Sequence, residues 1–166
     1  MTPPVLVVYA TKRESTHEVA DAVAARLREL GHEVDVRPAE EVGTLSPYAA
    51  VVIGGALYMG RWHHDARHFL SSHRDALTRL PVAVFAMGPR TTEESDMQGS
   101  RRQLDAALAK QPQLEPVSVA IFGGVIDPTK LRFPFRNMGA TDARDWDAIR
   151  SWADTVAELF AGRAAA

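Results

Sequence analysis

Residues 5–20 of the chain read VLVVYATKRESTHEVA, and this stretch indicates both the fold and the chemistry of the protein. An unbroken apolar run is followed by a turn rich in hydroxyl and basic side chains, and an amphipathic helix begins directly after the turn. Backbone N–H groups at the start of a helix lack intrahelical partners and lie at the positive end of the helix dipole, so they suit a bound phosphate. The side chains that can add hydroxyl groups or positive charge are Thr11, Lys12, Arg13, Ser15 and Thr16. The loop therefore predicts a site for a phosphorylated ligand.

The same residues also have a purely structural interpretation. Ser15 is followed three residues later by Glu18, which is the spacing of a capping box that satisfies the first N–H groups of a helix without a ligand. Both interpretations can hold at once. The other loops of the chain are needed to support the ligand.

The size and composition of the chain restrict its class. At 166 residues it is long enough for one well-buried domain and too short for two ordinary ones, so we expect a single domain over residues 1–166. A net charge of -2 argues against general attraction to nucleic acid or anionic membranes, because there is no basic surplus to release counterions. The lack of cysteine excludes disulfides, thiolate metal sites and cysteine nucleophiles.

The hydropathy of the chain indicates its compartment. No charged leader precedes the first apolar run, and no apolar stretch approaches the roughly 20 residues that a membrane-spanning helix needs. We therefore expect a cytoplasmic protein without an integral membrane segment. The last residues, 161–166, are mostly small, and we expect them to fray.

Apolar runs alternate with helical patterns along the whole chain. After the first strand, the predicted strands are residues 33–37, 49–55, 81–86 and 116–125. The predicted helices are residues 16–30, 62–79, 96–110 and 143–160, with a loop or brief helix over 39–48. Apolar strands that alternate with helices are typical of a parallel sheet covered on both faces. The sequence therefore predicts an α/β fold, a doubly wound five-stranded parallel sheet, with any ligand at the carboxyl ends of the strands.

Two more turns at that predicted edge have unusual compositions. Residues 54–62, GGALYMGRW, combine three glycines with aromatic side chains after the third strand. Glycine allows close backbone approach and positive φ, while Tyr58, Met59 and Trp62 offer flat or polarisable surfaces for a ring, although Trp62 could equally pack in the core. Residues 87–92, MGPRTT, follow the fourth strand and offer further backbone amides and hydroxyls. A phosphate loop with two turns able to enclose a planar ring suggests a mononucleotide.

With these loops considered together, the chain resembles the flavodoxin-like superfamily, whose members bind FMN. The first loop of that family usually reads Thr/Ser-x-Thr-Gly-x-Thr, and Thr11, Ser15 and Thr16 fit its hydroxyl-bearing positions. Arg13 replaces the inner threonine, and Glu14 stands at the glycine position. A carboxylate beside a phosphate is repulsive unless it points outward, and the loss of glycine forbids some backbone conformations.

A narrower resemblance covers nearly the full length of the chain. It rests on four segments: YATK at 9–12, ALYMGRW at 56–62, FGGVIDP at 122–128 and DWD at 145–147. These are similar to a flavodoxin-domain subfamily related to menaquinone-dependent protoporphyrinogen oxidase. Such oxidases have a long basic, aromatic amphipathic segment after the last strand, to which only residues 130–136, KLRFPFR, correspond here.

The resemblance implies which residues hold FMN. The phosphate would lie in the first loop, on Thr11, Lys12, Arg13, Ser15 and Thr16. One face of the isoalloxazine would lie on Ala56, Leu57, Tyr58, Met59 and Gly60, with Tyr58 or Met59 against the ring. The other edge of the flavin would lie along Gly88, Pro89, Arg90 and Thr91, where backbone N–H groups meet its polar rim. In such proteins the flavin carries out the redox chemistry, so no catalytic side chain is required.

Histidines just past the ring loop are weak candidates for a catalytic role. His63 or His64 could donate a proton during flavin reduction, because the pKa of imidazole lies near neutrality. His64 and His68 have the four-residue spacing of a helical metal site, but a metal normally needs a third protein ligand. We therefore predict no metal.

Three functional hypotheses follow from this interpretation. The preferred one is an FMN-binding oxidoreductase that transfers electrons between the flavin and an organic or quinone-type substrate. The second is an FMN electron carrier; carriers are often strongly acidic, so the net charge of -2 favours the first. The third is a flavin-free scaffold or binding module, because Glu14 replaces the loop glycine. The expected partners are a small molecule, a quinone or a redox protein, with a homodimer left open and no nucleic acid.

Overall fold

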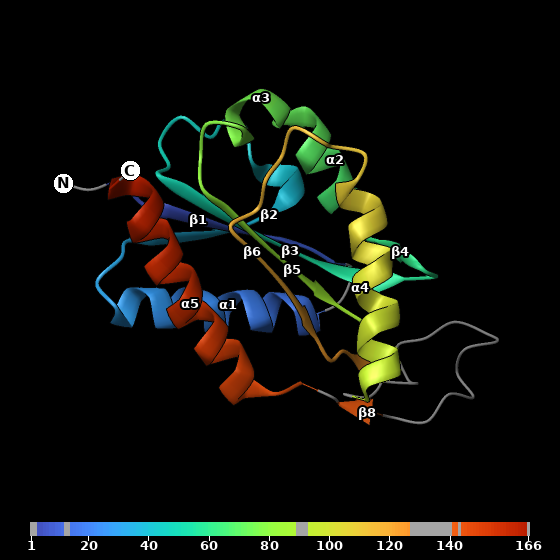
Figure 1. Cartoon of the computed structure of the whole chain (residues 1–166). Helices are drawn as coiled ribbons and strands as arrows, with labels where there is room; N and C mark the ends of the chain where they lie inside the picture. Colours follow the sequence, from blue (N-terminus) through green and yellow to red (C-terminus); the bar gives the residue numbers. More distant parts are fainter. Residues whose placement is uncertain (1–2, 12–13, 89–92, 127–140, 143, 166) are drawn as a thin grey trace.

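The computed structural model describes residues 3–11, 14–88, 93–126, 141–142 and 144–165, which are coloured in Figure 1. Its centre is a parallel sheet of five strands in the order β2-β1-β3-β5-β6. Their bounds are β1 Val5–Ala10, β2 Val34–Pro38, β3 Ala50–Tyr58, β5 Val82–Met87 and β6 Ser118–Phe122. The predicted five-stranded parallel sheet is confirmed.

Helices cover both faces of this sheet, so the fold is doubly wound (Figure 1). One face carries α1 (Glu14–Glu29) and α5 (Trp146–Ala165). The other carries the 3-10 helix η1 (Ala39–Glu41), α2 (His64–Ser72), α3 (Arg74–Leu77) and α4 (Glu94–Leu108). Successive strand residues point to opposite faces, so Val5 and Val7 of β1 join the core beneath α1 and α5, while Leu6 and Val8 join the other core. Burial on both faces explains why the strands are unbroken apolar runs.

The centre of the sheet is packed so closely that one glycine position admits no side chain. A Cβ on Gly54 of β3 would lie 2.0 Å from Cζ of Phe85 on β5. Phe85 in turn packs edge-on against Trp152 of α5, with 5.8 Å between the ring centroids. This packing links the central strands to the closing helix.

The predicted helix over residues 62–79 differs from the structure in two ways. Trp62 belongs to a short strand, β4 (Arg61–Trp62), and the helical part is divided into α2 and α3 at His73. His73 has φ -108° and ψ 21°, its ring packs on Phe69 with 4.5 Å between centroids, and it hydrogen-bonds to the backbone of Val42. The bond to Val42 lies outside the helical ladder and accompanies the break in a pattern that is otherwise helical.

The carboxyl-terminal part also departs from the predicted bounds. Helix α5 begins at Trp146 and runs to Ala165, so residues 161–165 continue the helix rather than forming a separate tail. Two short strands after β6, β7 (Val125–Ile126) and β8 (Thr141–Asp142), pair antiparallel in a separate ribbon. The segment 130–136 lies outside the described residues. Within the part of the chain that the structure describes, no helix is both long and apolar enough to cross a membrane.

Candidate functional site

The carboxyl ends of β1, β3 and β5 lie side by side. In the register of the sheet, Ala10 is opposite Gly55, and Ala56 is opposite Met87. The turns that follow these three strands therefore begin at one edge of the sheet, as the sequence predicts. Since β1 has β2 on one side and β3 on the other, this edge is the switch point at which open α/β sheets bind ligands.

A buried hydroxyl group lies at the start of α1, the helix that follows β1. Thr16, in the first turn of α1, is fully buried, and its Oγ1 has no hydrogen-bond partner among the residues that the structure describes. An unsatisfied buried hydroxyl costs roughly 1–3 kcal/mol, so such a group points to a missing partner. Thr11 and Ser15 lie beside it and are partly buried. Lys12 and Arg13 lie outside the described residues, and their contacts stay a prediction.

Glu14 is compatible with this loop in spite of replacing glycine. It is the first residue of α1, and its side chain is exposed. Met59 is the one non-glycine residue with positive φ in the described ranges, so Glu14 does not occupy a conformation that requires glycine.

The turn after β3 is a β-hairpin that the sequence did not reveal. Strand β3 continues to Tyr58 and pairs antiparallel with β4, with Leu57 opposite Trp62 and Tyr58 opposite Arg61. The two residues of the turn, Met59 and Gly60, have φ of 52° and 78°. Positive φ at both positions is typical of a type I′ turn, which matches the twist of the strands it joins.

The tip of this hairpin presents apolar surface to solvent. Tyr58 is 56% exposed and Met59 is 70% exposed. Met59 also adopts a left-handed backbone conformation, which is unfavourable for a residue with a Cβ and is found more often at functional sites. The structure thus places the two predicted ring-contacting side chains at the tip, clear of the core.

Trp62, by contrast, is a core residue. It is 1% exposed, and its Nε1 donates a hydrogen bond to the carbonyl oxygen of Gly55 at 3.0 Å. A Cβ on Gly55 would lie 2.6 Å from that nitrogen, so the indole lies directly on the strand. Of the two roles considered for Trp62, the structure shows packing: it holds β4 against β3 and so supports the hairpin.

The hairpin also contacts the turn after β5. A Cβ on Gly88 would lie 2.6 Å from Cδ1 of Leu57 and 3.0 Å from Oγ of Ser100. The backbone N–H of Gly88 donates to the carbonyl oxygen of Phe122 at 3.1 Å. The structure therefore brings Leu57 and Gly88 together, as the predicted site requires. Pro89, Arg90 and Thr91 lie outside the described residues, and their contribution stays a prediction.

The two histidine candidates differ in their surroundings. His63 is the N-cap of α2, and its Nδ1 accepts a hydrogen bond from the backbone N–H of Asp65 at 3.0 Å. The backbone N–H of His63 donates to the carbonyl oxygen of Ala56 at 2.9 Å. His64 is exposed and lies 3.4 Å from a carboxylate oxygen of Asp65. His63 is thus tied to the base of the hairpin, whereas His64 faces solvent. Among the described residues, no group of three metal-ligating side chains gathers.

Tyr9 and His17 form a contact that the sequence analysis missed. The phenol ring of Tyr9, near the end of β1, stacks on the imidazole of His17 in α1, with 4.1 Å between centroids and 10° between planes. His17 Nε2 lies 3.4 Å from a carboxylate oxygen of Asp21. The two aromatic residues are eight positions apart in sequence, so neither helical nor strand periodicity could have signalled the pair.

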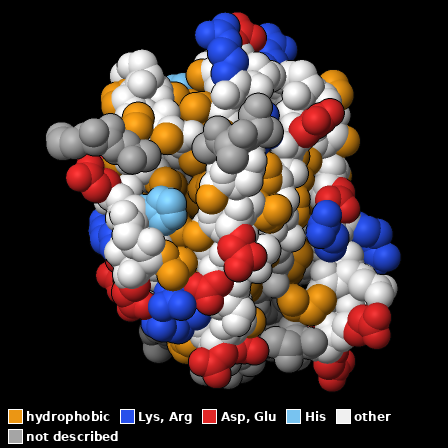
Figure 2. All heavy atoms as spheres, turned by 60° about the vertical axis from the view of Figure 1, so that its left-hand side comes forward, with side chains coloured by type: hydrophobic (Ala, Val, Ile, Leu, Met, Phe, Trp, Pro, Cys, Tyr) orange, Lys and Arg blue, Asp and Glu red, His pale blue; other side chains and the backbone are white. Residues whose placement is uncertain are grey.

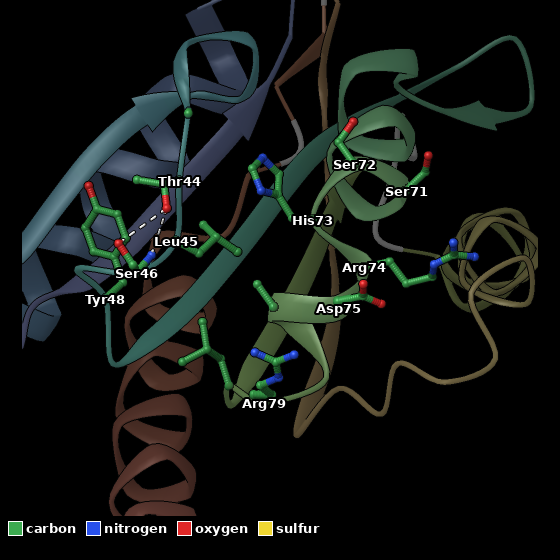
Figure 3. Close-up of a pocket in the computed structure, with 13 residues that line it drawn as sticks. Thr44, Leu45, Ser46, Tyr48, Ser71, Ser72, His73, Arg74, Asp75 and Arg79 are labelled. Carbon is green, nitrogen blue, oxygen red and sulfur yellow. Dashed lines mark hydrogen bonds between the residues drawn. The ribbon is translucent and has the colours of Figure 1, made fainter.

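A cavity lies at the opposite end of the sheet from these turns. It has a volume of about 530 Å³ and lies between the loop 43–48, which precedes β3, and the helices α2 and α3 (Figure 3). Two of the hydroxyl groups that line it donate hydrogen bonds: Thr44 Oγ1 to Ser46 Oγ at 3.3 Å, and Tyr48 Oη to Asp35 at 3.0 Å. We therefore locate the candidate site at the carboxyl edge, where the buried Thr16 hydroxyl has no partner among the described residues, and not in this cavity.

Comparisons with known proteins show the family of the chain. A family model described as flavodoxin domain matches residues 6–141. Protoporphyrinogen IX dehydrogenase [quinone] of Escherichia coli strain K12 is 23% identical over 171 residues, which cover 93% of this chain and 94% of the relative.

Solved structures share the fold. Oxidised flavodoxin 1 from Bacillus cereus superimposes with a TM-score of 0.63 at 15% identity, covering 93% of this chain and 97% of that chain. Rubredoxin oxygen:oxidoreductase from Desulfovibrio gigas gives a TM-score of 0.62 at 15% identity. The match covers 99% of this chain and 38% of that larger chain. The flavodoxin-like architecture predicted from sequence is thereby confirmed.

Proposed function

We propose that this chain, which belongs to the flavodoxin domain family, binds FMN. We further propose that it is an oxidoreductase acting on an organic or quinone-type substrate. The cofactor would supply the redox chemistry, and the protein would supply binding, orientation and access. The site at the carboxyl edge has the parts that such a ligand needs: a helix start, a buried hydroxyl and an exposed aromatic tip.

The residues proposed to hold FMN come from the three turns at that edge. The phosphate would be held by Thr11, Lys12, Arg13, Ser15 and Thr16. The ring would lie against the hairpin, on Ala56, Leu57, Tyr58, Met59 and Gly60. Its polar rim would meet Gly88, Pro89, Arg90 and Thr91. His63 and His64 are retained as proton-donor candidates, and His63 is the better placed because it is anchored to Ala56.

The single observation that carries the proposal is the hydroxyl of Thr16. It is buried, lacks a partner among the described residues, and lies in the first turn of a helix whose N–H groups favour an anion. A phosphate oxygen at this position would accept the hydroxyl hydrogen and remove the desolvation penalty. Glu14 is exposed and does not adopt the positive φ that favours glycine, which argues against the flavin-free alternative.

The substrate class rests on a different kind of support. The relative from Escherichia coli is named for protoporphyrinogen IX and for a quinone, and the similarity extends over nearly the whole of both chains. The alternative of a pure electron carrier is supported by the structural likeness to flavodoxin 1. Carriers are typically steered by strong surface charge, whereas the net charge here is -2, and the face in Figure 2 shows acidic and basic side chains interspersed.

FMN binding is tested with the purified full chain by its visible spectrum and by titration with FMN. We expect flavin absorbance and saturable binding at micromolar FMN. Thr16→Val is expected to weaken binding roughly 10- to 100-fold, because it removes one charge-assisted hydrogen bond. Thr44→Val, the same substitution at the opposite end of the sheet, is expected to leave FMN binding unchanged. Failure of the wild-type chain to bind micromolar FMN would exclude both flavin hypotheses.

Enzyme and carrier are separated by the choice of electron acceptor. The bound flavin is reduced, and its reoxidation is timed with a quinone and with a cytochrome. In a separate assay a porphyrinogen, which is an electron donor, is offered to the oxidised flavin. Rapid reoxidation by the quinone supports the oxidoreductase. Rapid reoxidation by the cytochrome alone would replace that proposal with the electron carrier.

A further inference from the structure

We infer that His17 is a positioning residue of the phosphate loop, acting through its stack on Tyr9 to hold the first turn of α1 against the end of β1. The inference deepens the proposed function and rests on it, since it assumes that the loop receives the phosphate of FMN. His17 is assigned no contact with the ligand.

The geometry places the stack where the loop needs support. Tyr9 is one residue from the end of β1, and His17 directly follows Thr16 in the first turn of α1. The rings are 4.1 Å apart at their centroids and nearly parallel, at 10°. The stack therefore joins the end of β1 to the first turn of α1, at the residue that follows Thr16 in the sequence.

The hydrophobic core does not provide this restraint by itself. Val19, Ala20 and Val23 of α1 pack with Val5 and Val7 of β1, so the core secures the helix from its second turn onward. The first turn bears the exposed Glu14 and the polar residues of the loop. The Tyr9–His17 stack is the aromatic contact that joins this first turn to the strand.

A second interaction orients the imidazole from the solvent side. Asp21, one helical turn further along α1, lies 3.4 Å from Nε2 of His17. The pKa of Tyr9, the other ring of the stack, is raised above its ordinary value by burial and by the carboxylates of Glu41, Asp21 and Glu40. Tyr9 therefore stays a neutral ring, and it adds no negative charge beside a phosphate site.

This arrangement predicts that the stack affects the phosphate end of the ligand only. Riboflavin has the same ring as FMN but lacks the phosphate, so it makes a matched probe. Loss of the stack should weaken FMN binding about fivefold to tenfold, as expected for an aromatic pair, and leave riboflavin binding unchanged. A general disturbance of the fold would instead weaken both ligands equally.

The test measures the affinities of FMN and riboflavin by flavin fluorescence for four forms of the full chain: wild type, His17→Ala, His17→Phe and the control His68→Ala. His68 lies on the exposed side of α2 and is not part of the proposed loop. We expect His17→Ala to weaken FMN alone, His17→Phe to restore most of the affinity because it keeps a flat ring, and His68→Ala to match wild type.

Other results would overturn the inference in distinguishable ways. If the wild type binds FMN and His17→Ala binds it equally well, His17 has no positioning role and the proposed function survives. If His17→Ala weakens FMN and riboflavin together, or His17→Phe fails to restore FMN affinity, stacking is not the cause. If the wild type binds neither flavin, the proposed function itself fails. Hydrogen exchange of the amides of residues 18–21, whose helical partners are the carbonyl oxygens of the first turn of α1, supplies a flavin-independent readout without ligand. His17→Ala should accelerate this exchange, and unchanged exchange would also overturn the inference.

Discussion

The two ends of the sheet differ in what their polar groups have as partners. The amino end has a cavity of about 530 Å³, yet the hydroxyls of Thr44 and Tyr48 are bonded to neighbouring side chains. The carboxyl end has the buried Thr16 hydroxyl without a partner in the described residues, and an exposed hairpin tip in an unfavourable backbone conformation. Volume alone therefore does not mark the ligand site. Unsatisfied polarity and local strain indicate it better, because each lowers stability unless a ligand compensates.

The largest effect is expected from removing the support of the hairpin. Trp62→Ala should lower the free energy of unfolding by roughly 3–5 kcal/mol, because it leaves a cavity in the core and removes the hydrogen bond to Gly55. Chemical denaturation of the chain without ligand measures this. Trp146→Ala is the matched control: Trp146 is 41% exposed, and its ring contact with Arg144 is worth no more than about 1 kcal/mol. Equal losses in the two variants would contradict the core role of Trp62.

Replacing threonine by valine at each end of the sheet compares the two ends directly. Thr16→Val should raise the free energy of unfolding of the ligand-free protein by about 1 kcal/mol while it weakens FMN binding, since it removes a buried hydroxyl that has no partner among the described residues. Thr44→Val should have the opposite sign on stability, with a small loss, because Thr44 Oγ1 accepts a hydrogen bond from the N–H of Ser46. Thermal unfolding with and without FMN checks both. Destabilisation of the ligand-free protein by Thr16→Val would show that its hydroxyl already has a partner.

The turn of the hairpin should show a similar conflict between stability and binding on a smaller scale. Met59→Asn is expected to raise the free energy of unfolding by about 0.5–1 kcal/mol, because asparagine adopts positive φ more readily in a type I′ turn. FMN binding should weaken a few-fold, since an apolar surface is lost from the ring contact. Gly60→Ala, in the same turn, should instead destabilise the protein, because alanine gains a Cβ at positive φ. A loss of stability in Met59→Asn would mean that the methionine is not strained.

Much of this comparison could be predicted from sequence, for reasons that lie in local patterns. Unbroken apolar runs predicted the strands, and the rule that parallel strands end together predicted that the turns after β1, β3 and β5 would begin at one edge of the sheet. The family resemblance then indicated the ligand that such an edge would hold.

The features that escaped prediction depend on tertiary contacts. Met59 stands where the Asn-Gly signal of a type I′ turn has asparagine, so the hairpin was not recognised and Trp62 was not assigned to the core. The break at His73 coincides with a hydrogen bond to the backbone of Val42, which lies 31 positions away in sequence. The Tyr9–His17 stack depends on how α1 lies against β1. Periodicity carries no information about any of these.

The smallest predicted effect is a pH dependence that belongs to the amino end alone. Burial lowers the pKa of His73 below its ordinary value, and a hydrogen bond to the backbone of Val42 offsets this only in part. As the pH falls through the ordinary histidine range, near 6.5, the unfolded chain takes up the proton first, so the folded state loses stability until the lower pKa is passed. His73→Phe keeps a ring against Phe69 and should therefore lose less stability than wild type between about pH 7 and pH 5.

Urea denaturation at several pH values measures this difference, with His32→Phe as the control for loss of an imidazole outside α2 and α3. The relation between stability and pH should change in His73→Phe only, and the affinity for FMN should stay at the wild-type value in both variants. A weaker affinity in His73→Phe would break the comparison, because it would couple the amino-end cavity to the site at the opposite edge of the sheet. An unchanged affinity would mean that this titration acts on the fold and that ligand binding depends on the carboxyl edge.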